Sequence, residues 1–398
     1  MRGILFFGIL ISLFVAIEFI SFRSLIRVVP ATWKLLSTLL YWITTGLAYG
    51  VIFYSIWKYP EFQLRRDFSV PFFAFGISLL LIIPKIIIVL TYGIDYVVLK
   101  TVVPAEFRED RRRFIASVGW VLASIPFLSI FWGMWKGKYS YRVDRVSIPL
   151  DPLSSEQPIR IVQLSDAHLG SFPKDAPIAK ALKRVNDLKP DIIVFTGDLV
   201  NSYAEEAEKW VDEFRELHAP YGKFSVLGNH DYGDYGRFES EEEKKTNHDR
   251  LIDIHKEMGF DLLLNENRKI SIGDRSIQLI GLENWGLPPF PQYGDLNKAK
   301  AGLEDGIPNV LLSHDPSHWD AQVLGQENIA LALAGHTHGM QFGLRIGGWQ
   351  WSPVKYKYPR WAGHYQIGNQ HLYVNRGFGY LGFPGRVGMP PEITYLEV

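Results

Sequence analysis

Two apolar runs in the second half of the chain decide its fold. They read Ile159-Arg-Ile-Val-Gln-Leu-Ser-Asp166 and Asp191-Ile-Ile-Val-Phe-Thr-Gly-Asp198. Near-continuous runs of this kind are typical of strands that are buried on both faces. The segment between them, 176–188, has apolar residues at helical spacing. A strand, a helix and a second strand in this order predict a largely parallel sheet in an α/β domain.

The same alternation continues toward the carboxyl end of the chain. We expect a further helix at 205–217 and a solvated, charged helix start at 239–245. The strand-rich later part predicts a second sheet that packs against the first. Further strands are expected at 223–229, 276–283, 309–314, 329–335 and 393–398.

Polar residues follow these strands at the points where the strands end. Ligands bind at the carboxyl edge of an open α/β sheet, so we expect these side chains to meet there. The glycines before Asp198, Asn229 and His336 fit sharp turns away from a strand. The residues at the strand ends are Asp166, His168, Asp198, Asn229, His230, Asp231, His314, His336 and His338.

The strand-end residues offer carboxylate, amide and imidazole donors for metal ions. The chain has no cysteine, which excludes disulfides, thiolate zinc sites, iron–sulfur clusters and a cysteine nucleophile. Imidazole and carboxylate together suit metals such as Mn, Fe, Co or Zn. Two such ions about 3.5–4 Å apart, joined by one aspartate, would polarise a phosphoryl group and lower the pKa of a shared water to about 7. The pattern therefore predicts a dinuclear metal centre.

The order of these blocks resembles that of a known family. Asp-x-His, Gly-Asp, Gly-Asn-His-Asp, His and Gly-His-Thr-His-Gly follow one another as in the calcineurin-like metallophosphoesterases, over about residues 157–398. The segments Val374-Asn-Arg-Gly-Phe-Gly379 and Pro390-Pro-Glu-Ile393 are similar to the membrane-anchored bacterial branch of that family. The resemblance implies a β-sandwich flanked by helices, with two metals at the strand ends. It also implies hydrolysis of phosphate esters by a hydroxide that bridges the metals.

The resemblance also implies roles for individual residues. His230 matches the acid that protonates the leaving group, Asp231 would orient it, and Asp198 matches the carboxylate that bridges the metals. Met340 and Asn201 depart from the family, because many relatives have a glycine and an acidic residue there, which concerns the fit of the substrate. The implied ligands are Asp166, His168 and His338 for the first metal, and Asn229, His314 and His336 for the second.

Candidate substrate contacts lie near the carboxyl end. The loop 375–386 is rich in glycine and aromatic residues and carries Arg376 and Arg386. Arginine forks suit phosphate oxygens, so either arginine could hold a second phosphate; a well-packed loop is the alternative. The aromatic segment 347–351 and Trp361 would either dip into a lipid headgroup layer or pack in the core.

The first 140 residues differ from the rest of the chain. They carry 15 Lys and Arg against 7 Asp and Glu and no histidine, whereas the rest carries 27 against 35 and all 11 histidines. Four apolar runs each approach or exceed the roughly 20 residues that span a bilayer. We expect a transmembrane region of four helices over 1–140 and a metallophosphoesterase domain over 141–398. The apolar runs are about 3–20, 35–57, 68–98 and 114–135.

Two charged residues lie inside these apolar runs, Glu18 in the first and Lys85 in the third. The two helices are expected to run in the same direction, and both charges lie toward the helix ends. They could therefore form an ion pair at similar depth. Snorkelling of Lys85 to the nearby interface is the alternative.

The sequence indicates less directly on which side of the membrane the second domain lies. Counts of Lys and Arg in the loops favour neither orientation once the segment after the fourth run is included. Asp110-Arg-Arg-Arg-Phe-Ile115, directly before that run, resembles the twin-arginine export signal, although the flank of an ordinary membrane anchor would look the same. We expect a multi-pass protein of a bacterial inner membrane with its catalytic domain outside the cytoplasm.

These features predict a membrane-anchored, metal-dependent phosphoesterase that hydrolyses a phosphate ester or pyrophosphate bond of a lipid-linked substrate. UDP-diacylglucosamine is one substrate that the resemblance implies. A phosphodiesterase for soluble nucleotides is the alternative among enzymes, and a non-catalytic membrane receptor or binding module is the alternative from another class. The intact ligand set argues against the latter. Nucleic acid is not expected as a partner, because the acidic domain would repel a polyanion.

Overall fold

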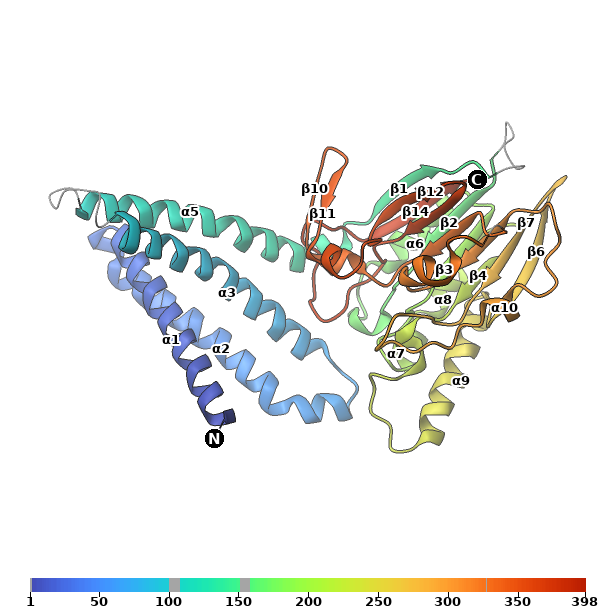
Figure 1. Ribbon diagram of the computed structural model, residues 1–398. Helices are drawn as coiled ribbons and strands as arrows, with labels where there is room; N and C mark the ends of the chain where they lie inside the picture. The colour runs from blue at the N-terminus through green and yellow to red at the C-terminus, as the bar shows by residue number, and fades with distance from the viewer. Residues whose placement is uncertain (1, 100–107, 151–157, 327) are drawn as a thin grey trace. The chain divides into compact units, whose positions relative to one another are not determined.

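The computed structural model describes residues 2–99, 108–150, 158–326 and 328–398. The chain divides into two compact units, Met1–Phe62 with Ser69–Trp135, and Gln63–Phe68 with Lys136–Val398 (Figure 1). Long helices make up the first unit, and the second combines strands with short helices.

The helices of the first unit are long and apolar. Three stretches of the described residues are long and apolar enough to cross a membrane: Ala31–Leu64, Ser69–Val97 and Glu109–Trp135. Large apolar side chains stay on their surface, since Leu47 is 67% and Ile56 is 69% exposed. Extended apolar surfaces of this kind are typical of contact with lipid. The helices are α1 (Arg2–Val28), α2 (Lys34–Leu64), α3 (Ser69–Ile94) and α5 (Arg108–Trp135).

An ion pair joins α1 to α3 inside this unit. Glu18 and Lys85 are 6% and 7% exposed, and Lys85 Nζ lies 2.6 Å from Glu18 Oε1 and 2.8 Å from Oε2. The hydroxyls of Tyr41 and Tyr49 donate to the same carboxylate over 2.6 and 2.8 Å. These bonds satisfy a charge that would be costly to bury alone in an apolar medium. The predicted ion pair is confirmed, and Lys85 points to Glu18 rather than to the interface.

Two six-stranded sheets form the centre of the second unit (Figure 1). Neighbouring strands in them are parallel except for the pairs β14–β2, β12–β13 and β6–β7, as the alternation of strands and helices predicts. The first sheet contains, in order, β1 (Arg142–Ser147), β14 (Glu392–Glu397), β2 (Arg160–Leu164), β3 (Ile192–Thr196), β4 (Lys223–Val226) and β5 (Asp261–Leu262). The second contains β12 (Gly363–Ile367), β13 (Gln370–Val374), β9 (Leu331–Ala334), β8 (Asn309–Leu312), β7 (Arg275–Gly281) and β6 (Glu266–Ile272). A separate two-stranded ribbon consists of β10 (Leu344–Ile346) and β11 (Trp349–Trp351).

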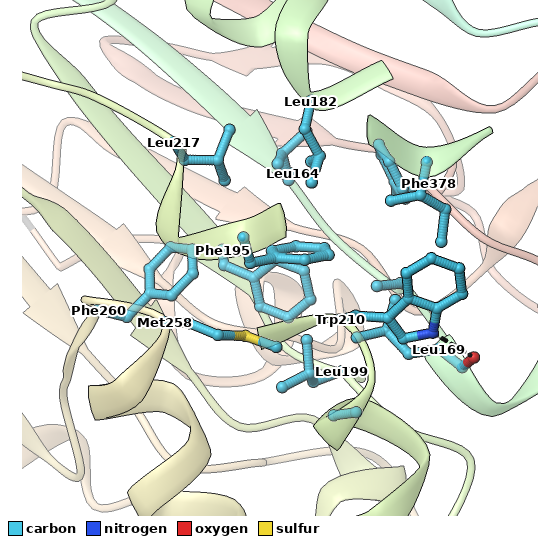
Figure 2. Packing of buried hydrophobic residues seen from close by; sticks show 14 of the residues in the cluster. Leu164, Leu169, Leu182, Phe195, Leu199, Trp210, Leu217, Met258, Phe260 and Phe378 are labelled. Carbon is cyan, nitrogen blue, oxygen red and sulfur yellow. Dashed lines mark hydrogen bonds between the residues drawn. The ribbon is translucent and has the colours of Figure 1, made fainter. Parts of the chain in front are cut away.

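Both faces of the first sheet are covered, which explains the continuous apolar runs. Ile161 of β2 packs in the core between the two sheets, whereas Val162 and Leu164 pack on the outer face. Figure 2 shows Leu164 and Phe195 of that outer face among side chains of the covering helices. The helices whose residues pack on this face are α6 (Ile178–Asp187), α7 (Glu205–Glu208), α8 (Val211–Arg215) and α9 (Glu241–Glu257).

The second sheet is also covered on both faces. Leu279 and Val310 face the first sheet, and Ile280 and Leu311 pack in a separate outer cluster. Leu296 of α10 (Leu296–Ala299) and a buried turn at Trp319–Val323 complete that cluster. The predicted β-sandwich flanked by helices is therefore the fold of the second unit.

One predicted element is wrong. Residues 205–217 form the two short helices α7 and α8 instead of one continuous helix. Trp210, between them, has non-helical backbone angles (φ −115°, ψ 2°) and is 2% exposed. Its Nε1 donates to the Leu169 carbonyl over 3.3 Å, as Figure 2 shows. Burial of this large side chain breaks a segment whose apolar spacing alone favours a single helix.

Candidate metal centre

The strand ends of both sheets meet at one edge of the sandwich. The first sheet supplies residues that follow β2, β3 and β4, and the second supplies residues that follow β8 and β9. A Cβ at Gly228 would collide with Asp198, and a Cβ at Gly335 would collide with Asp166, so these turns require glycine. The donors brought together are Asp166, His168, Asp198, Asn229, His314, His336 and His338.

Five of these residues have a left-handed backbone, which is uncommon outside glycine. The φ angles are 53° at Asp166, 44° at His168, 59° at Asp198, 69° at His336 and 52° at His338. Such residues cost about 1–3 kcal/mol each and cluster at functional sites, where the surrounding structure holds them. Aspartate and histidine tolerate this region better than most residues do. The turns thus aim their side chains across the edge at some cost in stability.

Asp166, His168 and His338 form the first donor group. His168 Nε2 lies 3.0 Å from His338 Nε2, and the latter lies 3.2 Å from Asp166 Oδ1. All three side chains are buried, with His338 the most accessible at 8% exposed. Three donor atoms thus converge on one point beneath the surface.

Asn229, His314 and His336 form the second donor group. His336 Nδ1 lies 2.9 Å from Asn229 Oδ1 and 3.3 Å from His314 Nε2. Asp198 lies between the two groups, since its Oδ2 is 3.1 Å from His314 Nε2 and 3.6 Å from His168 Nε2. This carboxylate therefore faces both groups, as a bridging ligand must.

The donor distances fit one cation in each group. First-row metals bind nitrogen and oxygen at about 2.0–2.2 Å, which places neighbouring ligands of one ion about 3.0–3.5 Å apart. The facing donors are separated by 2.9–3.6 Å. Because His314 Nδ1 bonds the Thr196 carbonyl over 2.8 Å, its Nε2 lone pair points into the site. Without a cation, such a cluster of buried lone pairs would be unfavourable.

The protonation states of the histidines also suit metal binding. Burial lowers the pKa of His168 well below its ordinary value and lowers those of His336 and His338 as well, so these imidazoles are neutral. Burial also acts to lower the pKa of His314, but the facing Asp198 outweighs it and raises that pKa to about 10. The pull of Asp198 thus favours positive charge at this position, either a proton on His314 Nε2 or a cation that would displace it.

His230 lies at the rim of the site, but Asp231 does not take the expected role. His230 Nδ1 bonds the backbone carbonyl of Asn201 over 2.7 Å, and its backbone N–H donates to Asp198 Oδ1 over 2.9 Å. The carboxylate of Asp231 instead accepts from the backbone N–H groups of Asp198, Leu199 and Gly228 over 2.8–2.9 Å. The prediction that Asp231 orients His230 is corrected: it holds the turn that carries Asp198. Because Asn201 uses its backbone, its departure from the family leaves this contact unchanged.

Neither predicted substrate arginine is open to a phosphate. Arg376 is 1% exposed, and its guanidinium pairs with Glu392 at 2.6 Å and with Asp144. Arg386 is 2% exposed, and its guanidinium donates to the carbonyls of Gly379 and His338 over 2.9 and 3.1 Å. Carboxylates and carbonyls already occupy the forks of both arginines, so the prediction of a phosphate contact is corrected to the packed-loop alternative.

Tyr358 is a residue of the site that sequence analysis missed. Its hydroxyl lies 2.8 Å from His336 Nε2, while the carboxylate of Asp315 lies 3.6 Å from the same nitrogen. With Phe290, Tyr358 lines a cavity of about 360 Å³ next to the second donor group, and Lys357 lies at its wall. No strand end precedes Tyr358, so the pattern that revealed the other residues gave no signal here.

Tyr358→Phe should weaken one of two metal sites. With the Tyr358 hydroxyl accepting a hydrogen bond from Nε2–H of His336, the Nδ1 lone pair stays free for a cation. Loss of such a partner typically costs about 10- to 100-fold in metal affinity. Titration with Mn²⁺ should therefore show one weakened and one unchanged site. Tyr356→Phe, two residues away and 78% exposed, is the control. Two unchanged sites in Tyr358→Phe would show that the hydroxyl does not position His336.

The fold and the donor set together define a metal-dependent hydrolase. The model of the family described as "Calcineurin-like phosphoesterase" matches residues 159–340. That of the family described as "Probable Calcineurin-like phosphoesterase, transmembrane domain" matches residues 1–138. The chain belongs to the calcineurin-like phosphoesterases, and it is a membrane protein with a metallophosphoesterase domain.

Relatives of this chain occur in bacteria and animals. An uncharacterized metallophosphoesterase of Bacillus subtilis, YkuE, is 33% identical over 59% of this chain and 77% of its own length. A zebrafish transmembrane protein with metallophosphoesterase domain is 30% identical over 64% of this chain, which spans 56% of that relative. The UDP-2,3-diacylglucosamine pyrophosphatase LpxG of Chlamydia trachomatis is 28% identical over 71% of this chain and 96% of its own length.

Proposed function

We propose that this protein hydrolyses a phosphate ester or pyrophosphate bond in a lipid-linked substrate at the membrane surface. The observation that carries the proposal is the pair of donor groups that share Asp198, whose Oδ2 lies 3.1 and 3.6 Å from one histidine of each group. The apolar helices of the first unit and the similarity to LpxG support a lipid-linked substrate. A pyrophosphate such as UDP-2,3-diacylglucosamine is a member of this class.

Seven side chains would hold two cations, which could be Mn, Fe, Zn or Co. Bound cations of this kind polarise a phosphoryl group and supply hydroxide near neutral pH. Asp198 would bind both, because it faces both groups. Asp166, His168 and His338 would hold the first, and Asn229, His314 and His336 the second.

His230 would serve as the general acid. Its Nδ1 hydrogen bond to the Asn201 carbonyl fixes the ring and leaves Nε2 directed away from that contact. In the doubly protonated ring, Nδ1–H stays on the carbonyl while Nε2–H is donated to the leaving oxygen. The His230 backbone is bound to Asp198, so the proton donor and the shared carboxylate keep a fixed relation to each other. This arrangement suits departure of an alkoxide or phosphate.

The catalytic unit would lie outside the cytoplasm of a bacterial cell, on its inner membrane. The support is the run Asp110–Ile115 and its resemblance to an export signal. Intact spheroplasts that carry the protein should then hydrolyse bis-p-nitrophenyl phosphate, which does not cross membranes. Hydrolysis that appears only after lysis would place the unit in the cytoplasm.

The substrate class is tested with the full chain in lipid nanodiscs containing Mn²⁺. We expect kcat/KM for UDP-2,3-diacylglucosamine to exceed that for the same pyrophosphate without acyl chains by at least about tenfold, because tethering at the membrane raises the effective substrate concentration. Equal values would contradict a lipid-linked substrate and favour a phosphodiesterase for soluble nucleotides. A loaded dinuclear site with no turnover of any ester would favour a non-catalytic binding module.

A further inference from the structure

The ribbon β10–β11 projects from the rest of the second unit (Figure 1). Its strands pair antiparallel, with Leu344 opposite Trp351, Arg345 opposite Gln350 and Ile346 opposite Trp349. Two glycines form the tip, and both have the positive φ angles, 56° and 87°, that a tight hairpin turn requires. Residues opposite each other share a face, and alternate residues share a face as well. The ribbon therefore has one polar and one apolar face.

The polar face of the ribbon is bound to the protein. Arg345 Nη1 lies 2.8 Å from Asp144 Oδ2 on β1. Gln350 donates to the Ala362 carbonyl over 3.0 Å and accepts from Arg376 Nη1 over 3.1 Å. Arg376 itself pairs with Asp144, so one network with buried Asp144 and Arg376 at its centre fixes both strands. This network also sets which face of the ribbon turns outward.

Three of the four side chains of the apolar face are exposed, and the fourth, Trp351 at the base of the ribbon, is half-buried. Leu344 is 52%, Ile346 is 68% and Trp349 is 57% exposed. A one-residue shift in register would reverse the faces, but the bonds of Arg345 and Gln350 hold the present register. A ribbon in water would have the opposite arrangement, with apolar side chains against the protein. The exposed face therefore suits an apolar medium.

A short segment of chain joins the apolar helices of the first unit to the strand that binds this ribbon. Six residues, 136–141, join the end of α5 to the start of β1, and they can span at most about 20–25 Å. β1 carries Asp144, the residue that binds Arg345. The turn Pro353–Tyr356, directly after β11, adds a tyrosine that is 78% exposed and the exposed Lys355. Aromatic and basic side chains together are typical of membrane interfaces.

We propose that the apolar face of β10–β11 inserts into the interfacial layer of the bilayer that this chain spans. β10 begins six residues after His338, a donor of the first group. An inserted ribbon therefore holds the donor groups close to the lipid headgroups. The evidence for membrane contact by the ribbon is its exposed apolar face and its fixed register. Its use in reaching a lipid-linked phosphate rests on the proposed function.

The absence of cysteine from the sequence makes a direct test possible. Ile346→Cys in the full chain is labelled with an environment-sensitive fluorophore in nanodiscs, and the quenchers are lipid nitroxides near the headgroup or aqueous iodide. The control is Ile367→Cys, at the end of β12 and directly before a hairpin glycine, where the isoleucine is 41% exposed. We expect lipid nitroxides to quench position 346 at least about twofold more than position 367, as for a side chain within the headgroup boundary. Iodide should show the opposite order.

Three results would overturn the proposal. If iodide quenches the fluorophore at position 346 and lipid nitroxides do not, the ribbon stays in water. Equal lipid quenching at both positions would show general proximity to the membrane without insertion of this ribbon. Protection of position 346 from both quenchers would identify a protein partner as the occupant. None of these measurements uses turnover, so a failure here is distinct from a failure of the proposed activity.

Discussion

Asp198→Asn is expected to lower kcat for bis-p-nitrophenyl phosphate by about a thousandfold or more. The substitution keeps the shape of the side chain and removes the charge that faces both donor groups at 3.1 and 3.6 Å. Bound cations contribute several kcal/mol to the stabilisation of charge in the transition state, and each 1.4 kcal/mol corresponds to a factor of ten in rate. Elemental analysis should find fewer than two metal ions per chain in the variant.

The matched control for this prediction is Asp212→Asn. The side chain of Asp212 is 87% exposed and pairs with Arg215 on the surface, so its loss should change neither metal content nor rate. If Asp198→Asn binds two ions with unchanged affinity and keeps its activity, the carboxylate is not the shared ligand. If circular dichroism shows that Asp198→Asn is unfolded, His314→Gln tests the metal centre in its place. That variant should lose metal from the second donor group alone.

His230→Gln is expected to lower kcat by about 10²- to 10⁴-fold while two metal ions stay bound. The ring lies at the rim of the site, fixed through Nδ1 to the Asn201 carbonyl, and its Nε2 would protonate the leaving oxygen. The loss should be larger for a phenyl ester than for the corresponding p-nitrophenyl ester, because phenolate needs a proton more than p-nitrophenolate does. Rates for both esters, together with metal content, check the prediction.

The control for His230→Gln is His218→Gln, an exposed histidine of the same unit, which should behave like the unchanged protein. Equal losses on the phenyl and p-nitrophenyl esters would show that His230 acts elsewhere than on the leaving oxygen. Loss of metal in the variant would show instead that the ring supports the donor groups. The two substitutions thus separate the residue that moves a proton from the residue that holds cations.

The strands of the sandwich could be predicted because their signal is local. Both faces of β2 are buried, Ile161 toward one core and Val162 toward the other, and a strand of this kind has a continuous apolar run. The helix boundary at Trp210 could not be predicted, since apolar spacing is the same for one helix and for two. Only the space between β3 and the covering helices decides where that indole lies.

The candidate donors could be predicted for a related reason. Each follows a strand, and the ends of parallel strands come together at one edge whatever the details of packing. Tyr358 contacts His336 from a loop 22 residues further along the chain, and nothing in its neighbours indicates that contact. Arg376 lies in a glycine-rich loop of the kind that binds phosphate, but its guanidinium forms ion pairs with Glu392 and Asp144. Both carboxylates come from outside this loop, so the loop sequence does not indicate these pairs.

The sequence by itself determined that apolar helices precede an α/β sandwich and that its strand ends carry nitrogen and oxygen donors. Those properties depend on the period and composition of single segments, which burial of each segment imposes directly. Only the tertiary structure decided that Asp231 supports a turn while the Asn201 backbone holds His230. It also decided that the apolar face of β10–β11 turns outward. These contacts join residues that are far apart in the sequence. Packing of the whole unit decides which of them come into contact, and no single segment carries that information.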